Sequence, residues 1–167
     1  MLQGQFQIHT ERILSKFTEI AILKKATLYR IWLVTPWITY GKKSGDPLIN
    51  LINAAYQTNP KIILITRPPE SVENESAITF LRSHSSTTTF ILPFLHSKIY
   101  ILECDGFRMA FFGSPNFTAG GNERNREIAI DIRTTSDDKK EIAAGLITNL
   151  LTYVSELRGD ADLLLQG

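Results

Sequence analysis

Apolar residues recur with two different spacings along the chain, and the two spacings alternate. Apolar positions three and four residues apart predict helices, whereas short apolar runs bounded by Gly, Pro or polar clusters predict strands. Helices are predicted at 9–27, 46–57, 71–82 and 136–158, and strands at 30–35, 61–66, 89–92, 94–102 and 127–132, with a further strand before Gly113. The alternation favours an α/β fold with a mixed, largely parallel sheet flanked by helices on both faces.

The composition indicates one globular domain over residues 1–167, because 43% of the residues are hydrophobic. The formal net charge is +1, so a nucleic-acid enzyme would need a local basic patch. The single cysteine, Cys104, excludes an internal disulfide framework and a cysteine-rich zinc site. The N-terminus shows no signal-peptide pattern, and no stretch approaches the roughly 20 apolar residues of a membrane span. We therefore expect a cytoplasmic protein with no membrane partner.

Two cationic side chains interrupt the apolar run at 94–102. His96 and Lys98 are two residues apart, so in an extended strand their side chains point to the same face. A buried pair of this kind is unfavourable unless an anion receives it. A single histidine on an apolar strand is more often an ordinary core residue, and the three histidines show no metal-ligand spacing.

A second polar cluster follows the predicted strand that ends near Gly113. The run Gly113-Ser114-Pro115-Asn116 supplies a hydroxyl, an amide and a glycine that lets a ligand approach the backbone, although such runs are usually only turns. Glu127 opens the next predicted strand. Together with His96, these groups could form an oxyanion pocket with a nucleophilic or acid/base histidine and no evident metal ligands.

The ordered combination of these motifs resembles the signature of the phospholipase D superfamily, in which HxK is followed by GSxN and then by an acidic residue. The segments 33–38, 47–52, 61–69 and 93–96 also resemble that family, in its order, and the resemblance covers residues 28–135. It implies a phospholipase D-like fold. The family's active site contains two HxK motifs, and this chain carries one, so the resemblance also implies a homodimer that shares the site.

The resemblance implies a role for each motif residue. One His96 would attack phosphorus to form a phosphohistidine, while His96 of the second subunit would protonate the leaving oxygen and later activate water. Lys98 and Asn116, assisted by Ser114, would hold the non-bridging oxygens, and Glu127 would orient an imidazole. No metal or other cofactor is required by this scheme.

The chain departs from the signature at one position. The family's Asp lies five residues after the Lys, where this chain has Glu103. Asp105 is not its replacement, because Cys104-Asp105-Gly106 is predicted to form the turn of the hairpin. The role of Glu103 stays open.

Several side chains outside the motif are candidates for substrate binding. An aromatic residue and two lysines lie in the loop after strand 30–35, where they could stack bases and hold phosphates or simply face solvent. Arg67 could contact a phosphate or pair with Glu70. Two arginines precede Glu127 in a glycine-containing loop, where they could bind backbone phosphates or remain solvated. The candidates are Trp37, Lys42, Lys43, Arg67, Arg124 and Arg126.

The resemblance favours a metal-independent nuclease acting on nucleic acid, with DNA preferred, and is compatible with the catalytic domain of a restriction or defence endonuclease. A further specificity domain or a helicase partner would fit that role. One alternative is a phospholipid phosphodiesterase or phosphatidyltransferase, although those relatives generally carry two motifs. The other is a catalytically inactive nucleic-acid-binding module, which the presence of all five motif residues disfavours.

Overall fold

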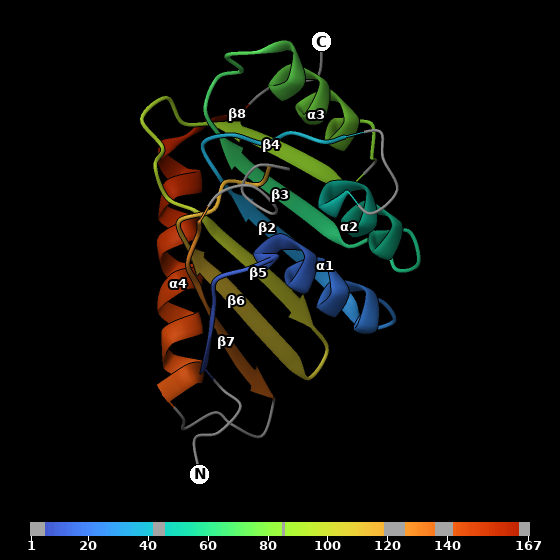
Figure 1. Ribbon diagram of the computed structural model, residues 1–167, viewed down its shortest axis with the longest axis vertical. Helices are drawn as coiled ribbons and strands as arrows, with labels where there is room; N and C mark the ends of the chain where they lie inside the picture. Colours follow the sequence, from blue (N-terminus) through green and yellow to red (C-terminus); the bar gives the residue numbers. More distant parts are fainter. Residues whose placement is uncertain (1–5, 42–45, 85, 119–125, 136–141, 164–167) are drawn as a thin grey trace.

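The computed structural model describes residues 6–41, 46–84, 86–118, 126–135 and 142–163. These form one mixed β-sheet with helices packed on it (Figure 1). The sheet has the strand order β1-β7-β6-β5-β2-β3-β4-β8. The strands are β1 Phe6–His9, β2 Leu28–Val34, β3 Lys61–Thr66, β4 Thr87–Ile91, β5 Ile99–Cys104, β6 Phe107–Gly113, β7 Ala129–Thr135 and β8 Asp162–Leu163. The helices are α1 Ile13–Leu23, α2 Pro47–Ala55, α3 Val72–Arg82 and α4 Ile142–Asp160.

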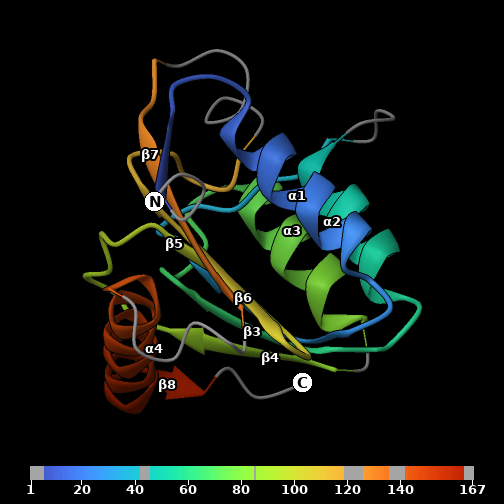
Figure 2. The ribbon, with the colours of Figure 1, turned by 90° about the horizontal axis from the view of Figure 1, so that it is seen from below.

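The helices are divided between the two faces of the sheet. Helices α1, α2 and α3 cover one face, and α4 lies on the other (Figure 2). The expected α/β fold with helices on both faces is therefore confirmed. The sheet is less parallel than expected, because only β2–β3 and β3–β4 are parallel among the described strand pairs. Helices α2 and α3 connect these three neighbouring strands as parallel crossovers, whereas β5, β6 and β7 follow one another as antiparallel neighbours.

Several element boundaries differ from the sequence-based predictions. The strand expected at 94–102 begins only at Ile99, so His96 and Lys98 precede it in an irregular segment. Strand β7 likewise begins at Ala129, and Glu127 lies before it. Strand β1 was not predicted; it pairs antiparallel with β7, and Arg12 then turns the chain into α1 with a φ of 48°. In the described part of the chain, no helix combines the length and apolar content that crossing a membrane requires.

The segments that carry the motif meet at one end of the central strands, which we call the sheet edge. The registers place Val34 beside Ile99, Ile99 beside Phe112, and Gly113 beside Ala129. Strands β2, β3 and β6 therefore end at the same edge at which β5 and β7 begin. The segments immediately beyond this edge contain Trp37, Arg67, His96 to Lys98, Ser114 to Asn116, and Glu127, which is why residues far apart in sequence meet there.

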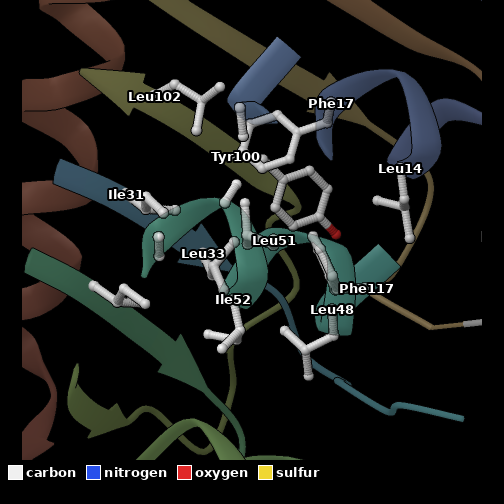
Figure 3. Close-up of a cluster of buried hydrophobic side chains, with 14 of the residues drawn as sticks. Leu14, Phe17, Ile31, Leu33, Leu48, Leu51, Ile52, Tyr100, Leu102 and Phe117 are labelled. Atoms are coloured by element: carbon white, nitrogen blue, oxygen red, sulfur yellow. The ribbon is translucent and has the colours of Figure 1, made fainter. Parts of the chain in front are cut away.

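Three aromatic residues of the core, Phe17, Tyr100 and Phe117, lie together (Figure 3), and Tyr100 is the second residue of β5. The ring of Tyr100 packs edge-on against Phe117, with ring centroids 5.2 Å apart, and at a tilt of 53° against Phe17, with centroids 5.8 Å apart. The Tyr100 hydroxyl donates a hydrogen bond of 2.7 Å to the carbonyl oxygen of Pro115. The core therefore fixes the backbone of the loop that carries Ser114 and Asn116.

The hairpin turn between β5 and β6 lies at the opposite end of these strands. Cys104 pairs with Phe107, and Gly106 has a φ of 70°, a conformation that glycine adopts without strain. The predicted turn at 104–106 is confirmed. The backbone N–H of Asp105 donates to the carbonyl oxygen of Thr27 at 2.9 Å, which ties the turn to the start of β2.

Glu103 lies near this turn and not near the motif residues. Its carboxylate is 3% exposed and accepts hydrogen bonds from Trp32 Nε1 at 3.0 Å, Arg30 at 3.1 Å and the Tyr29 hydroxyl at 3.3 Å. All three donors belong to β2, so Glu103 links β5 to β2. The position that the family signature assigns to Asp is structural in this chain.

We expect Glu103→Ala to lower the free energy of unfolding by about 2–4 kcal/mol, because the buried Trp32 N–H and the Arg30 guanidinium would lose their acceptor. Urea unfolding followed by circular dichroism measures the change. Glu103→Gln is the matched control, since it keeps one acceptor oxygen and should be less destabilising. A variant that is fully stable but has lost its activity would instead place Glu103 in the reaction.

Candidate active site

His96 and Lys98 lie side by side at the sheet edge, outside the regular strand. A turn from Leu92 to Leu95 precedes the two residues, and in it the Leu95 N–H donates to the Leu92 carbonyl oxygen at 3.1 Å. Lys98 Nζ donates to the carbonyl oxygen of His96 at 2.9 Å and lies 3.4 Å from His96 Nδ1. The expectation of a buried strand pair was wrong: His96 is exposed and Lys98 is half-buried. Their position at the edge avoids the cost of fully burying the Lys98 charge and leaves the imidazole accessible to a substrate.

Ser114 and Glu127 meet where β6 ends and β7 begins. The Ser114 hydroxyl donates to Oε2 of Glu127, and the Ile128 N–H donates to the Ser114 hydroxyl at 3.0 Å. A side chain on Gly113 would bring its Cβ to 2.2 Å from the Ile128 carbonyl oxygen, so only glycine permits this close approach. Within one chain Glu127 therefore orients Ser114; its predicted contact with an imidazole remains a prediction.

The side chain of Asn116 stands out in the described part of the chain because of its amide oxygen. Its amide oxygen Oδ1 is buried and has no hydrogen-bond partner among the described residues. The backbone on either side of Asn116 is fixed by hydrogen bonds. The Pro115 carbonyl oxygen accepts from the Tyr100 hydroxyl, and the Phe117 N–H donates to the Thr35 hydroxyl at 3.1 Å. The loop is therefore held while Oδ1 is unpaired among the described residues, so this oxygen can accept a hydrogen bond from a group outside the chain.

Tyr100 and Thr35 were not identified from the sequence. The Thr35 hydroxyl also donates to the carbonyl oxygen of Trp37 at 2.9 Å, so one side chain connects the Trp37 loop with the loop that carries Asn116. Tyr100 carried a usable signal, because a buried tyrosine in an apolar strand usually finds a partner for its hydroxyl. Its partner on a loop fifteen residues away could not be identified without the tertiary structure.

Arg67 and Trp37 lie at the same edge and contact each other. The Arg67 guanidinium lies over the Trp37 ring, with its central carbon 5.0 Å from the ring centroid. Arg67 Nε donates to the carbonyl oxygen of Leu95 at 2.7 Å. The alternative pairing of Arg67 with Glu70 was wrong: none of the described ion pairs contains either residue.

The other candidates for substrate binding are less constrained by the structure. Arg126 is exposed and precedes Glu127, so it lies at the margin of the site. Lys42, Lys43 and Arg124 lie outside the described residues. Among the residues that are described, no three His, Cys, Asp or Glu side chains come together as metal ligands would.

The electrostatics of the site act mainly on Lys98. Partial burial lowers the pKa of Lys98, the positive charge of Arg67 lowers it further, and the carboxylate of Glu127 opposes both effects. The charges of Arg67 and Glu127 therefore both act on the Lys98 ammonium. Burial raises the pKa of Tyr100, so its hydroxyl stays protonated as the donor to Pro115. A bound anion would relieve the repulsion between the two cations.

The fold and this arrangement of residues define the class of the protein. A family model described as "Cardiolipin synthase, PLD-like domain" matches residues 20–149. The chain therefore belongs to the phospholipase D superfamily, whose members are phosphodiesterases and related phosphoryl-transfer proteins, and the resemblance inferred from the motif is confirmed.

Solved structures of this superfamily share the fold. Nuc from Salmonella typhimurium, described as a phospholipase D family member, matches with a TM-score of 0.70 at 14% identity over 97% of this chain and 100% of its own. NucT from Helicobacter pylori gives 0.67 at 13% identity, over 96% of this chain and 99% of its own. Phosphatidylserine synthase from Haemophilus influenzae gives 0.63 at 9% identity, over 95% of this chain but 39% of its own. No curated protein matches the chain.

Proposed function

We propose that this chain is a metal-independent nuclease that hydrolyses phosphodiester bonds in nucleic acid, with DNA as the preferred substrate. The observation that carries the proposal is the convergence of His96, Lys98, Ser114 and Asn116 at one sheet edge, where the amide oxygen of Asn116 has no hydrogen-bond partner among the described residues. The superfamily supplies the reaction class, and its single-motif members of this size are commonly nucleases.

The first step transfers the phosphoryl group to the protein. An imidazole nitrogen of one His96 attacks phosphorus, the P–N bond forms, and the bond to the leaving sugar oxygen breaks. His96 of the second subunit gives its proton to that oxygen. Lys98 Nζ and the side-chain N–H groups of Asn116 donate hydrogen bonds to the non-bridging oxygens, where negative charge must be stabilised as the bonds change.

The second step releases the phosphate end of the cleaved strand. The second His96, now neutral, takes a proton from water as the water oxygen attacks phosphorus. The P–N bond breaks, and the first His96 returns to its starting state with a phosphomonoester as product. Both histidines thus end the cycle as they began it.

The proposal requires two copies of the chain, because each contributes one HxK motif. In a twofold dimer the same surface of both subunits meets, which places the two motifs face to face. The surface around His96 suits such a contact: Phe94 is 92% exposed, and Ile128, which follows Glu127, is 53% exposed. Large apolar side chains that flank a site in this way are typical of protein–protein contacts.

We expect the purified protein to be a dimer at micromolar concentration and to cleave labelled nucleic acid in the presence of EDTA. The assay compares single- and double-stranded DNA and RNA with and without chelator, and light scattering measures the mass. Phosphatidylglycerol vesicles, assayed in parallel, test the lipid alternative. Full activity in a monomer would contradict the shared site, and loss of activity on chelation that magnesium restores would contradict the metal-independent mechanism.

A further inference from the structure

Two cations of the site are held by consecutive peptide groups. The carbonyl oxygen of Leu95 accepts from Arg67 Nε at 2.7 Å, and the carbonyl oxygen of His96 accepts from Lys98 Nζ at 2.9 Å. The charge of Arg67 also acts on the Lys98 ammonium and lowers its pKa, so the two anchored cations lie near each other at the sheet edge. Arg67 comes from the end of β3 and Lys98 from the start of β5, and their proximity is produced by the fold.

Arg67 is held rigidly, yet the fork of its guanidinium remains available. Its Nε is bonded to Leu95, and its plane lies against the Trp37 ring, which in turn is tied through its carbonyl to the Thr35 hydroxyl. Among the described residues, no acceptor contacts its two terminal amino groups, and no carboxylate neutralises it. A planar guanidinium fixed in this way is well suited to bind a phosphate with two parallel hydrogen bonds.

Two neighbouring cations repel each other in the absence of substrate. The charge of Arg67 lowers the pKa of Lys98, which is the expected consequence of placing like charges together. In the proposed reaction Lys98 and Asn116 bind the phosphate that is cleaved. A single phosphodiester carries one negative charge, so it leaves Arg67 without a counter-ion.

We propose that Arg67, supported by Trp37, forms a subsite for a second phosphate next to the one that is cleaved. The inference rests on the proposed function and narrows it: the substrate is a strand with phosphates in series, and the site selects against isolated phosphodiesters, including lipids with one phosphate. Arg67 is thus a specificity residue that acts through the neighbouring phosphate, while His96, Lys98 and Asn116 act on the reacting one.

The test compares two substrates that differ in the second phosphate. Arg67→Ala should raise KM for a single-stranded oligonucleotide about 10- to 100-fold, as expected for the loss of a charge-assisted hydrogen-bond pair. For bis(p-nitrophenyl) phosphate, which has one phosphate, kcat/KM should change less than about 2- to 3-fold, a change within the range of ordinary surface substitutions. In a plot of the logarithm of the oligonucleotide binding constant against the logarithm of the salt concentration, the slope should decrease in magnitude by about 0.7. This is the value for one phosphate contact on a single strand.

Two control variants separate this role from others. Arg158→Ala removes an exposed arginine from the end of α4 and should leave both substrates unaffected. Arg67→Lys keeps the charge but not the fork, so it should recover part of the oligonucleotide KM. Circular dichroism and thermal melting verify that each variant is folded. If Arg67→Ala instead lowers kcat equally for both substrates, Arg67 merely supports the Leu95–His96 segment, and the proposed subsite is wrong.

Failure of the inference can be distinguished from failure of the proposed function. A wild-type protein that cleaves bis(p-nitrophenyl) phosphate while Arg67→Ala leaves the oligonucleotide KM unchanged refutes the subsite alone. A wild-type protein that cleaves neither substrate refutes the proposed nuclease. Fluorescence anisotropy of a labelled oligonucleotide then still tests the subsite, because a 10-fold weaker Kd for Arg67→Ala supports it and an unchanged Kd overturns it.

Discussion

Replacing His96 by alanine is expected to abolish phosphodiester cleavage while the domain stays folded and dimeric. The His96 side chain is exposed and its hydrogen-bonding contact in the structure is with Lys98, so its removal creates no cavity. In a shared site the substitution removes both the nucleophile and the acid. General acid–base catalysis alone contributes about 10²- to 10⁴-fold, so the combined loss should exceed that range.

The decisive measurement uses mixed dimers. Cleavage is assayed for wild type, His96→Ala and dimers with one chain of each kind, all with EDTA present. The mixed dimer should be impaired as well, because one of its two histidines is missing. His84→Ala is a matched control, since His84 is bonded to Ser86, away from the motif. Cleavage retained by His96→Ala would exclude the phosphohistidine mechanism.

The second large effect is expected for Lys98. Lys98→Ala should lower kcat about 10²- to 10³-fold, the range observed when one donor to a developing negative charge is removed. Lys61→Ala is a suitable control, because Lys61 is an exposed lysine at the opposite end of β3. The Lys98→Ala protein should melt close to the wild-type temperature. Unchanged turnover by a folded Lys98→Ala protein would show that Lys98 does not bind the reacting phosphate.

The pH dependence offers an independent check on the same residue. Lys98 acts as a cation, so activity is present below its pKa and is lost as the pH rises through it. Because burial and Arg67 lower this pKa, the alkaline decline should occur below the pH of an ordinary lysine. Removing Arg67 should shift the decline to higher pH, and the pH–rate profiles of wild type and Arg67→Ala measure the shift.

The sequence predicted the central elements well because their signals are local. Strand β3 and helix α3 have strong local patterns, and the Asp-Gly turn after β5 follows from its own two residues. The prediction that His96 and Lys98 lie within a strand was wrong for a different reason. The apolar run continues through them, but β5 can begin only where β2 offers a partner, and the pairing of Val34 with Ile99 sets that limit.

The site was predictable as a set of residue types but not as a set of contacts. The motif order selected His96, Lys98, Ser114, Asn116 and Glu127 as candidates, while the stacking of Arg67 on Trp37 depends on the tertiary arrangement of three separate segments. Glu103 illustrates the same limit. A carboxylate in the right place of a signature was chemically ambiguous until its three partners on β2 were known.

The turn at Asp105 and Gly106 has a consequence for protein engineering. Strand β5 has six residues, so the turn lies about 20 Å along the strand from the edge that carries His96. Both turn residues are exposed, and only the Asp105 N–H is used to anchor them. A foreign DNA-binding module inserted between them would therefore be tethered to the domain without disturbing the groups of the candidate site. Under the proposed nuclease function, the insert would then determine which DNA is cleaved.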